Sequence, residues 1–402
     1  MHALEDIKVA DFSWIIAGPT TTKLLADSGA QVIRIESYHS PDNLRSISPM
    51  KDGVSGINRS ATYARYNSSK YGVSLNLKHP KGLELAKRIV AWADIVVENY
   101  TPGVMERLGL GYEELTKVRP DIIMLSMPLL GHTGPLANHP GLGVQLSDLI
   151  GFGNLTGWPD RGPCTLPGAY TDFISPHFAI AAVIAALDHR RRTGKGQYIE
   201  ICQFEAGLQF IAPVLLDWVV NGREPVRKGN DCDYAVPHGV YRCRGRDRWC
   251  AITVFTSTEW KSLCGVIDNP ALSGEPDFET LMGRRKHSAE IDRLIEVWTT
   301  LHDAEQVMQL LQAAGVAAGV VANGQDLFEN PQLENRGFYK PLEHAEIGLH
   351  HYPIPPFKLS RTPCEPRMPA PCLGQHNEYV YRQIIGVSDT EFVELLNDGV
   401  FE

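Results

Sequence analysis

The sequence predicts an α/β protein with a doubly wound, Rossmann-like large domain on a parallel sheet, together with a smaller α+β domain. Short β-branched runs alternate with helical patterns through the first half, which is typical of βαβ units. From about Pro225 the pattern changes to polar-rich strands and short helices. The chain has 402 residues, more than one hydrophobic core usually holds, so two domains are expected.

The elements of the parallel sheet follow one another through the first part of the chain. Three predicted strands end at Phe12, Glu36 and Glu98, each close to Gly, Ser or Asn. Ligands of open parallel sheets bind outside the carboxyl ends of the strands, so these ends are expected to line a cleft. The fingerprint G-x-G-x-x-G does not follow the first strand, which disfavours a nicotinamide or flavin enzyme. The expected strands are 7–12, 31–36, 94–98 and 120–126, and the expected helices are 20–28 and 80–93.

The rest of the chain carries a long apolar helix and then the smaller domain. We expect Pro176–Arg192 to form an almost fully buried helix, and the Gly-containing turn within Val240–Ile252 predicts a hairpin. The domains are predicted as 1–224, the first part of the large domain; 225–325, the small α+β domain; and 326–402, a return linker with the C-terminal part of the large domain. Further expected elements are a strand at 197–202, helices at 206–221, 257–267, 289–299, 304–314 and 389–397, and a proline-rich surface connector at 352–371.

Composition and charge narrow the classes of function. The net charge of −9 disfavours a nucleic-acid binder, which needs a basic face, but leaves room for an anionic small ligand held by a few local cations. None of the eight cysteines forms a C-x-x-C pair, so no metal site is expected. The N-terminus lacks the layout of a signal peptide, and the apolar run Phe178–Leu187 is too short to span a bilayer. A cytoplasmic protein without membrane contact is therefore expected.

Asp172 is the candidate catalytic residue. It lies in an apolar stretch just before the helix that is expected to begin near Pro176. The positive end of a helix can hold such a carboxylate ionised without a fixed partner. An ionised and partly desolvated carboxylate can attack a thioester carbonyl as a covalent nucleophile. From the local pattern alone, a role near the N-cap of the helix is the competing interpretation.

Seven short blocks, in order along nearly the whole chain, carry a resemblance to a known family. They are Asp11-Phe12-Ser13 with Ala17-Gly18-Pro19; Leu25-Ala26-Asp27 with Gly29-Ala30; Val32-Ile33-Arg34-Ile35-Glu36; Glu98-Asn99-Tyr100 with Pro102-Gly103-Val104-Met105-Glu106-Arg107-Leu108-Gly109; His132-Thr133-Gly134-Pro135; Thr193-Gly194-Lys195-Gly196-Gln197; and Leu373-Gly374-Gln375-His376-Asn377. Each block alone is unspecific, but their shared order and spacing are not. The sequence resembles the family III CoA-transferases, the family of formyl-CoA and carnitine-type CoA-transferases that also includes α-methylacyl-CoA racemase.

The resemblance implies a function for Asp172, which occupies the place of the family's nucleophile before the long helix. It implies that CoA moves from an acyl-CoA donor to a carboxylic acid acceptor, through a mixed anhydride and an aspartyl-CoA thioester on this residue. CoA is then substrate and product, and neither ATP nor a metal is required. Matching positions imply CoA contacts as well; these residues are Ala17, Leu75, Lys78, Asn99, Arg107 and Leu108. Lys78 and Arg107 would supply cationic donors to phosphate oxygens, and as surface charges they also have an ordinary solvated interpretation.

Three departures from the family pattern bear on specificity. Ser37 follows Glu36 where many relatives carry Arg, so a phosphate or adenine contact is missing or moved. Ile16 stands where formyl-type enzymes have Gln, and Thr253–Ser257 stands near the place of their glycine-rich loop. The last two departures argue against formate and oxalate, and favour a larger, less polar acyl group.

Two alternatives to a CoA-transferase remain at this point. A racemase needs an acid/base histidine in a Gly-His-Asp setting, where this chain has Gly141-Leu142-Gly143, with His139 nearby but separated by Pro140. A CoA-binding subunit of a hetero-oligomer would have lost the nucleophile, and Asp172 is present. The segments Phe12–Pro19 and Tyr66–Lys70 resemble the benzylsuccinate CoA-transferase branch, which implies succinyl-CoA as donor and an aromatic succinate as acceptor. The family also implies an interlocked dimer, either a homodimer or a heterodimer with a related subunit.

Overall fold

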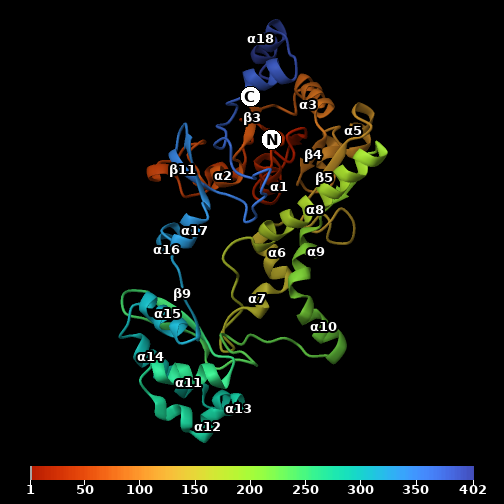
Figure 1. Ribbon diagram of the computed structural model, residues 1–402. Helices are drawn as coiled ribbons and strands as arrows, with labels where there is room; N and C mark the ends of the chain where they lie inside the picture. The colour runs from red at the N-terminus through yellow and green to blue at the C-terminus, as the bar shows by residue number, and fades with distance from the viewer. Residues whose placement is uncertain (1) are drawn as a thin grey trace. The chain divides into compact units, whose positions relative to one another are not determined.

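The computed structural model describes residues 2–402, and the chain divides into two compact units (Figure 1). Unit 1 comprises the chain up to Phe152 with Thr165–Arg223 and Glu334–Glu402, and unit 2 comprises Gly153–Cys164 and Glu224–Leu333. Within unit 2 the short early segment is held to the later one by backbone pairing, because the Gly229 N–H donates to the Gly157 carbonyl at 2.9 Å.

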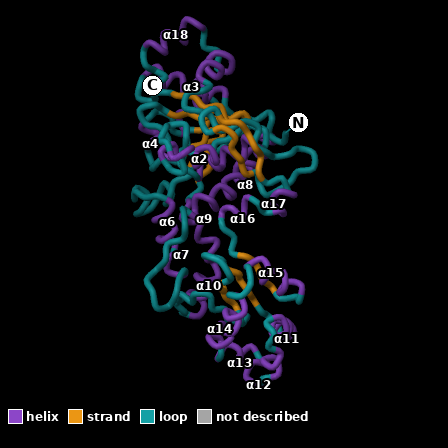
Figure 2. Tube along the Cα trace, turned by 90° about the vertical axis from the view of Figure 1, so that its left-hand side faces the viewer, coloured by secondary structure: helices purple, strands orange, loops and turns teal. Residues whose placement is uncertain are grey.

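Unit 1 is built on a six-stranded sheet whose neighbouring strands are all parallel. The strand order β3-β2-β1-β4-β5-β6 is doubly wound, so the order reverses between β1 and β4. This confirms the predicted α/β class and its parallel sheet, and Figure 2 shows these strands side by side in unit 1. The strands are β1 (Lys8–Asp11), β2 (Gln31–Glu36), β3 (Lys70–Ser74), β4 (Ile95–Glu98), β5 (Ile123–Ser126) and β6 (Tyr198–Glu200).

Apolar layers cover both faces of this sheet. Ile33 and Val96 pack with the helix after β3 and with C-terminal side chains such as Tyr381. Their neighbours along the strands, Val32 and Val97, pack into the opposite layer with the first helix and the long helix. Successive side chains of a strand point to opposite faces, so a strand covered on both sides is apolar throughout, as these strands are.

One of the helices expected before Asn221 is broken in the structure. The predicted helix at 206–221 is interrupted, because Pro213 lies in the first turn of a new helix and cannot continue the preceding one. The α-helices are α1 (Ala17–Asp27), α2 (Ala61–Tyr66), α3 (Pro80–Trp92), α4 (Val104–Arg107), α5 (Tyr112–Val118), α6 (Gly143–Ile150), α7 (Phe152–Leu155), α8 (Tyr170–Thr193), α9 (Gln203–Leu208) and α10 (Ala212–Asn221). The 3₁₀ helices are η1 (Asn43–Ser46), η2 (Lys51–Gly53) and η3 (Gln209–Ile211).

The long helix α8 departs from its prediction at both its start and its burial. It begins at Tyr170, so Asp172 lies inside its first turn and Pro176 inside the helix. Proline usually occupies the first helical position, which is why the sequence placed the start near Pro176. The expected near-complete burial is also wrong, since Phe178 is 41% and Ile184 44% exposed. The helix carries apolar residues on all its sides, but the rest of unit 1 covers only part of its surface.

By length and composition alone, α8 is also the one helix among residues 2–402 that could cross a membrane. The expectation that no segment spans a bilayer was based on the shorter apolar run Phe178–Leu187 within this helix. In unit 1, α8 packs against α1, α6, α9 and β5, as a core helix does. It also carries the buried Asp172 and three arginines in its last turn.

The C-terminal part of unit 1 returns to the sheet. The predicted surface connector is exposed only in its middle, because Cys364, Ala370 and Pro371 are buried. The Ser69 N–H donates to the Met368 carbonyl at 2.9 Å, which holds this return segment beside β3. The elements here are α17 (Pro331–Asn335), an antiparallel hairpin of β10 (Tyr339–His344) and β11 (Gly348–Pro353), a π-helix η5 (Tyr379–Ile384) and α18 (Asp389–Asn397).

Unit 2 is an α+β unit with a three-stranded antiparallel sheet of order β7-β8-β9. The predicted hairpin is confirmed as β7 and β8. Trp260, Ile252 and Val307 are among the buried side chains that join the sheet to its helices. The strands are β7 (His238–Arg242), β8 (Trp249–Thr253) and β9 (Ala317–Val320); the helices are α11 (Ser257–Val266), η4 (Pro270–Gly274), α12 (Pro276–Glu279), α13 (Leu281–Lys286), α14 (Ser288–Thr299), α15 (Ala304–Ala313) and α16 (Gly324–Phe328).

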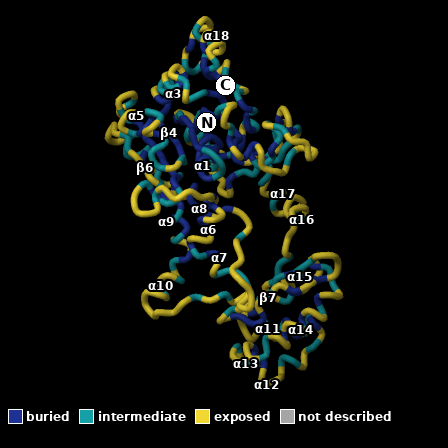
Figure 3. The backbone as a smooth tube through the Cα atoms, turned by 180° about the vertical axis from the view of Figure 1, so that it is seen from behind, coloured by how far each residue is buried: buried dark blue, intermediate teal, exposed yellow. Residues whose placement is uncertain are grey.

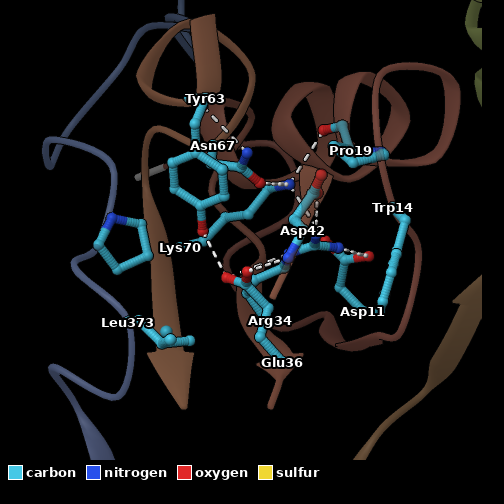
Figure 4. A network of polar contacts seen from close by, with 12 residues as sticks. Asp11, Trp14, Pro19, Arg34, Glu36, Asp42, Tyr63, Asn67, Lys70 and Leu373 are labelled. Atoms are coloured by element: carbon cyan, nitrogen blue, oxygen red, sulfur yellow. Dashed lines mark hydrogen bonds and ion pairs between the residues drawn. The ribbon is translucent and has the colours of Figure 1, made fainter. Parts of the chain in front are cut away.

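A buried network of charges ties β1, β2 and β3 together (Figure 4). Arg34 on β2 pairs with Asp42 at 2.5 Å and with Asp11 at 3.4 Å, and Lys70 on β3 lies 3.1 Å from Asp11. Burial alone would raise the pKa of Asp11, but Lys70 and Arg34 outweigh it and hold that pKa at about 2. The network keeps the Asp11 carboxylate ionised within the sheet.

Glu36 belongs to the same network and has no free oxygen for a ligand. Its carboxylate accepts bonds from the Arg45 guanidinium at 2.9 and 2.7 Å and from the Tyr63 hydroxyl at 2.7 Å. Figure 4 shows the Tyr63 hydroxyl pointing at this carboxylate. A dinucleotide-binding sheet often uses an acid at this place for a ribose hydroxyl. In this chain Glu36 instead joins β2 to Arg45 and Tyr63 and so has a structural role.

Candidate active site

Two cavities of unit 1 open at the carboxyl ends of the strands. The first, which we call the Asp172 cavity, has a volume of about 110 Å³ and follows β1 and β4. The second, the β2–β3 cavity, has a volume of about 480 Å³ and follows β2 and β3. Tyr100 lines both, so the two cavities adjoin at its side chain. The strand ends at which the sequence predicted a cleft thus lie at these cavities.

Asp172 lies in the first turn of α8 and is 6% exposed. Among residues 2–402 no side chain donates a hydrogen bond to its carboxylate or forms an ion pair with it. Burial raises the pKa of Asp172 to about 7. The sequence predicted that the end of the helix would hold this carboxylate ionised. Desolvation instead favours its neutral form, and no partner among the described residues compensates. An aspartate that titrates near neutrality beside a cavity is typical of a catalytic group.

The raised pKa predicts a pH dependence for any reaction in which Asp172 is the nucleophile. Only the ionised form attacks, so kcat/KM should rise about tenfold per pH unit below pH 7 and level off above it. Initial rates measured between about pH 5.5 and pH 8.5 test this. A flat profile over that range would show that the carboxyl titrates like an exposed aspartate.

Gly143, the first residue of α6, lies against the Asp172 side chain. A Cβ at this position would lie 2.8 Å from Asp172 Oδ1 and 2.6 Å from the Ala169 Cβ. Both distances are shorter than van der Waals contact. The close approach of the two helix starts therefore requires glycine here.

Gly143→Ala should lower kcat by about 10- to 100-fold, because the added methyl group displaces the Asp172 carboxylate. Gly141→Ala is the matched control. A Cβ on Gly141, which lines the same cavity, would meet only the Leu129 side chain at 3.6 Å, an ordinary contact. Steady-state kinetics of both variants check the prediction, and equal effects would contradict it.

Asn99, at the end of β4, fixes the loop between β1 and α1. Its Oδ1 accepts from the Trp14 N–H at 2.7 Å and its Nδ2 donates to the Trp14 carbonyl at 2.8 Å. The next residue, Ile15, has a φ of 65° and is held by Asp42 at 3.1 Å. The strained loop carries Ile16 and Ala17 along the Asp172 cavity. Asn99 thus shapes the cavity through Trp14 as well as lining it.

The predicted CoA-binding residues divide between the two cavities. Ala17 and Asn99 line the Asp172 cavity, and Leu75, Lys78 and Leu108 line the β2–β3 cavity. Arg107 lies on the exposed side of α4 with its guanidinium over Gly103, outside both sets of lining residues. All the predicted residues except Arg107 therefore line one of the two adjoining cavities.

Ser37 and His39 occupy the wall of the β2–β3 cavity where the sequence lacks the usual arginine. The Ser37 hydroxyl donates to the Glu402 carbonyl and accepts from the His39 N–H, both at 3.2 Å. The side chains of this lining that can carry positive charge are Lys78 and His39. Apolar groups such as Trp14 and Leu108 form most of the wall, which suits a planar base or an alkyl chain.

Two polar residues of the Asp172 cavity are not among the predicted site residues. Gln203 was not predicted at all, and the sequence indicated His139 only as the histidine near the racemase acid/base position. His139 lines the cavity, although Pro140 had seemed to separate this histidine from the site. Gln203, the first residue of α9, donates from Nε2 to the Met127 carbonyl at 3.1 Å, while its buried Oε1 has no partner among the described residues. Neither belongs to a motif, and only the folding of the loop at 137–143 and of α9 onto α8 brings them to Asp172.

Comparison with known proteins agrees with this geometry. A sequence model of CoA-transferase family III matches residues 4–377. The chain belongs to CoA-transferase family III. It is 28% identical to succinyl-CoA:glutarate CoA-transferase of Homo sapiens, over 99% of this chain and 90% of that protein. It is 30% identical to succinyl-CoA–D-citramalate CoA-transferase of Chloroflexus aurantiacus, over 98% of this chain and 96% of that protein.

The fold of this family III CoA-transferase also matches a solved structure. A CaiB/BaiF family protein from Brucella suis superposes with a TM-score of 0.87 at 27% identity, covering 95% of this chain and 99% of that one. Within residues 2–402, no group of three or more His, Cys, Asp or Glu side chains is placed to hold a metal ion.

Proposed function

We propose that this CoA-transferase moves CoA from succinyl-CoA to a second carboxylic acid, with Asp172 as the covalent nucleophile. The observation that carries the proposal is a buried carboxylate that has no partner among the described residues. It lies in a small cavity that adjoins a larger, mostly apolar one. A group of this kind loses less solvation on attacking a thioester than an exposed carboxylate does. The succinyl donor is proposed from the relatives, whose names specify succinyl-CoA.

The first half of the reaction loads CoA onto the enzyme. The Asp172 carboxylate attacks the thioester carbonyl of succinyl-CoA, and the C–S bond breaks to give a mixed anhydride and CoA thiolate. The thiolate then attacks the aspartyl carbonyl of the anhydride. Succinate leaves as a carboxylate, and an aspartyl-CoA thioester remains.

The second half reverses these steps with the acceptor. Its carboxylate attacks the aspartyl-CoA thioester, which releases CoA thiolate and forms a new mixed anhydride. The thiolate attacks the acceptor carbonyl, and the product acyl-CoA leaves with Asp172 restored as a carboxylate. Every step exchanges one activated acyl bond for another, so no external energy source is needed.

The two cavities suggest how CoA is placed. The β2–β3 cavity has the volume and apolar walls for the nucleotide end, with Lys78 and His39 as cationic donors to phosphate. The pantetheine arm would pass Tyr100 to bring the sulfur to Asp172. Gln203 Oε1, buried without a partner, is an acceptor for a ligand N–H in the Asp172 cavity. Arg107 would contribute from outside through its charge.

For the acceptor we propose a dicarboxylic acid, and within that class an aromatic succinate. Glutarate and citramalate, the acids named for the relatives, are dicarboxylic acids. The aromatic substituent is proposed from the resemblance of the segments Phe12–Pro19 and Tyr66–Lys70 to the benzylsuccinate branch. Ile15, Ile16 and Leu129 supply apolar lining next to Asp172 that would suit such a group.

We also propose that the working form is a dimer, with a second copy or a related subunit. Helix α10 has no buried residue (Figure 3). Its side chains Trp218, Val219 and Val220 are 57%, 77% and 75% exposed. Helix α8 of unit 1 also exposes apolar side chains, among them Phe178 and Ile184. Surfaces of this kind mark protein interfaces. Light scattering of the purified chain should give twice its mass of 44.5 kDa, unless the partner is a different subunit.

The proposed function is tested with a panel of acceptor acids. The chain is incubated with succinyl-CoA and one acid at a time, and the acyl-CoA products are separated by chromatography. The proposal predicts a new acyl-CoA and an equal amount of succinate with at least one dicarboxylic acid. Formation of free CoA and succinate with every acid would instead identify a thioesterase.

One observation favours a second candidate, an α-methylacyl-CoA racemase. His139 shares the cavity with Asp172, so a two-base proton exchange at an α-carbon has two ionisable groups available. Incubation of a 2-methylacyl-CoA in deuterium oxide separates the two functions. A racemase incorporates deuterium at the α-carbon without any second carboxylic acid, whereas the transferase does not.

A further inference from the structure

The Asp172 cavity is short of positive charge. Three of the lining side chains are of types that can carry a charge; they are Asp172, Tyr100 and His139. Burial raises the pKa of Tyr100 well above its usual value, so this phenol stays neutral. Neither lysine nor arginine is among the lining residues, which leaves His139 as the one lining group, within residues 2–402, that can be cationic.

His139 is also available to bind a ligand. It lies in a turn whose backbone is fixed by a 2.9 Å bond from its own N–H to the Leu136 carbonyl. The residue is exposed, and its imidazole makes no hydrogen bond to another described residue. Only Pro140, Gly141 and Leu142 separate it from the start of α6, where Gly143 lies against Asp172. The turn therefore presents, at the same cavity as Asp172, an imidazole that no described residue uses.

The proposed substrates require a positive charge in this cavity. A dicarboxylic acid bound through one carboxyl group at Asp172 still carries a second, ionised carboxylate. Asp172 is itself anionic when it attacks, so two negative charges would share a space of about 110 Å³. Uncompensated, that proximity would weaken binding of the substrate and raise the pKa of Asp172 further.

We propose that His139 binds the free carboxylate of the dicarboxylic substrate and so selects dicarboxylic over monocarboxylic acyl groups. This inference rests on the proposed function and adds the residue that distinguishes dicarboxylic from monocarboxylic substrates. A protonated imidazole donates a charge-assisted hydrogen bond to a carboxylate, and a terminal methyl group offers no such acceptor. Discrimination then comes from the charge that a monocarboxylic acyl chain lacks.

The test compares succinyl-CoA with butyryl-CoA, which has the same chain length and a methyl group in place of the carboxylate. His139→Gln keeps a polar side chain but removes the charge. It should lower kcat/KM for succinyl-CoA about tenfold or more, and change that for butyryl-CoA by less than about twofold. His139→Lys restores a positive charge and should recover most of the preference for succinyl-CoA. His287→Gln, in unit 2, is the surface control.

The outcomes separate this inference from the proposed function. If wild-type protein and His139→Gln load CoA from succinyl-CoA at equal rates, the inference is overturned while the transferase function stands. Equal losses with both acyl-CoA substrates would overturn it as well, because they show a structural role. Loss of α-proton exchange in His139→Gln would assign this residue to acid/base chemistry instead. If wild-type protein loads no CoA at all, it is the proposed function that fails.

Discussion

Asp172→Asn should lower turnover by about 10³-fold or more and leave CoA binding nearly unchanged. The amide is almost the same size as the carboxylate, so the cavity and its lining are kept, but the nucleophilic oxygen is lost. Steady-state kinetics with succinyl-CoA and calorimetric titration with CoA measure the two quantities separately. A CoA-binding subunit that is not catalytic would show little change in either.

The same substitution should stabilise the fold above neutral pH. The pKa of Asp172 is raised to about 7 in the folded state from about 3.8 in the unfolded chain. The ionised carboxylate therefore costs stability that increases from pH 4 to pH 7 and stays constant above. Asp172→Asn removes that cost, which is at most about 4 kcal/mol at pH 8 and close to zero at pH 4. Thermal melts at both pH values check the sign. Asp148→Asn, an exposed aspartate on α6, is the control and should show no such trend.

Arg34→Met should destabilise unit 1 by about 3–5 kcal/mol, the second large effect expected. The guanidinium is fully buried between Asp42, Asp11 and Glu36. Its removal leaves the buried Asp42 without a counter-charge, while Asp11 keeps only Lys70 and Glu36 keeps only Arg45. Chemical denaturation followed by circular dichroism measures the loss, and soluble yield should fall as well. The cost comes from stranded charge, so lowering the pH to protonate the carboxylates should recover part of it.

Arg244→Met is the matched control for Arg34→Met. Arg244 on unit 2 pairs with Asp303 at 2.6 Å, a distance like that in the network, but both side chains are about half exposed. Exposed ion pairs contribute about 0–1 kcal/mol because water and salt screen them. A loss as large as that of Arg34→Met would show that burial does not set the energy of these pairs.

The parallel sheet could be predicted from the sequence because its strands are apolar on both faces. Val32-Ile33 and Val96-Val97 carry that signal directly. The strand β3 was missed, since Lys70–Ser74 contains a lysine and a glycine. The lysine is buried in the charge network, and Gly72 leaves room for Pro371 of the return segment. Both reasons lie far away in the sequence, so no local pattern contains them.

The candidate site could be predicted only in part, because some of its residues reach the cavity through contacts between segments far apart in the sequence. Asp172 was found from an acid in an apolar stretch and from a family resemblance, and the structure adds its burial and raised pKa. The start of α8 was misplaced because Pro176 lies inside the helix. Gln203 and His139 reach the cavity through tertiary packing alone. The buried charges that lock Glu36 could not be inferred either, because the pairing of Arg45 with Glu36 depends on the fold of η1.

The most direct test of the central claim is the intact mass of the protein after incubation with succinyl-CoA. The proposed mechanism predicts a covalent CoA adduct on the wild-type chain that hydroxylamine removes, because a thioester on Asp172 is cleaved by this nucleophile. Asp172→Ala should show no adduct under the same conditions. An adduct that survives hydroxylamine, or one that persists in Asp172→Ala, would contradict the assignment of Asp172 as the nucleophile.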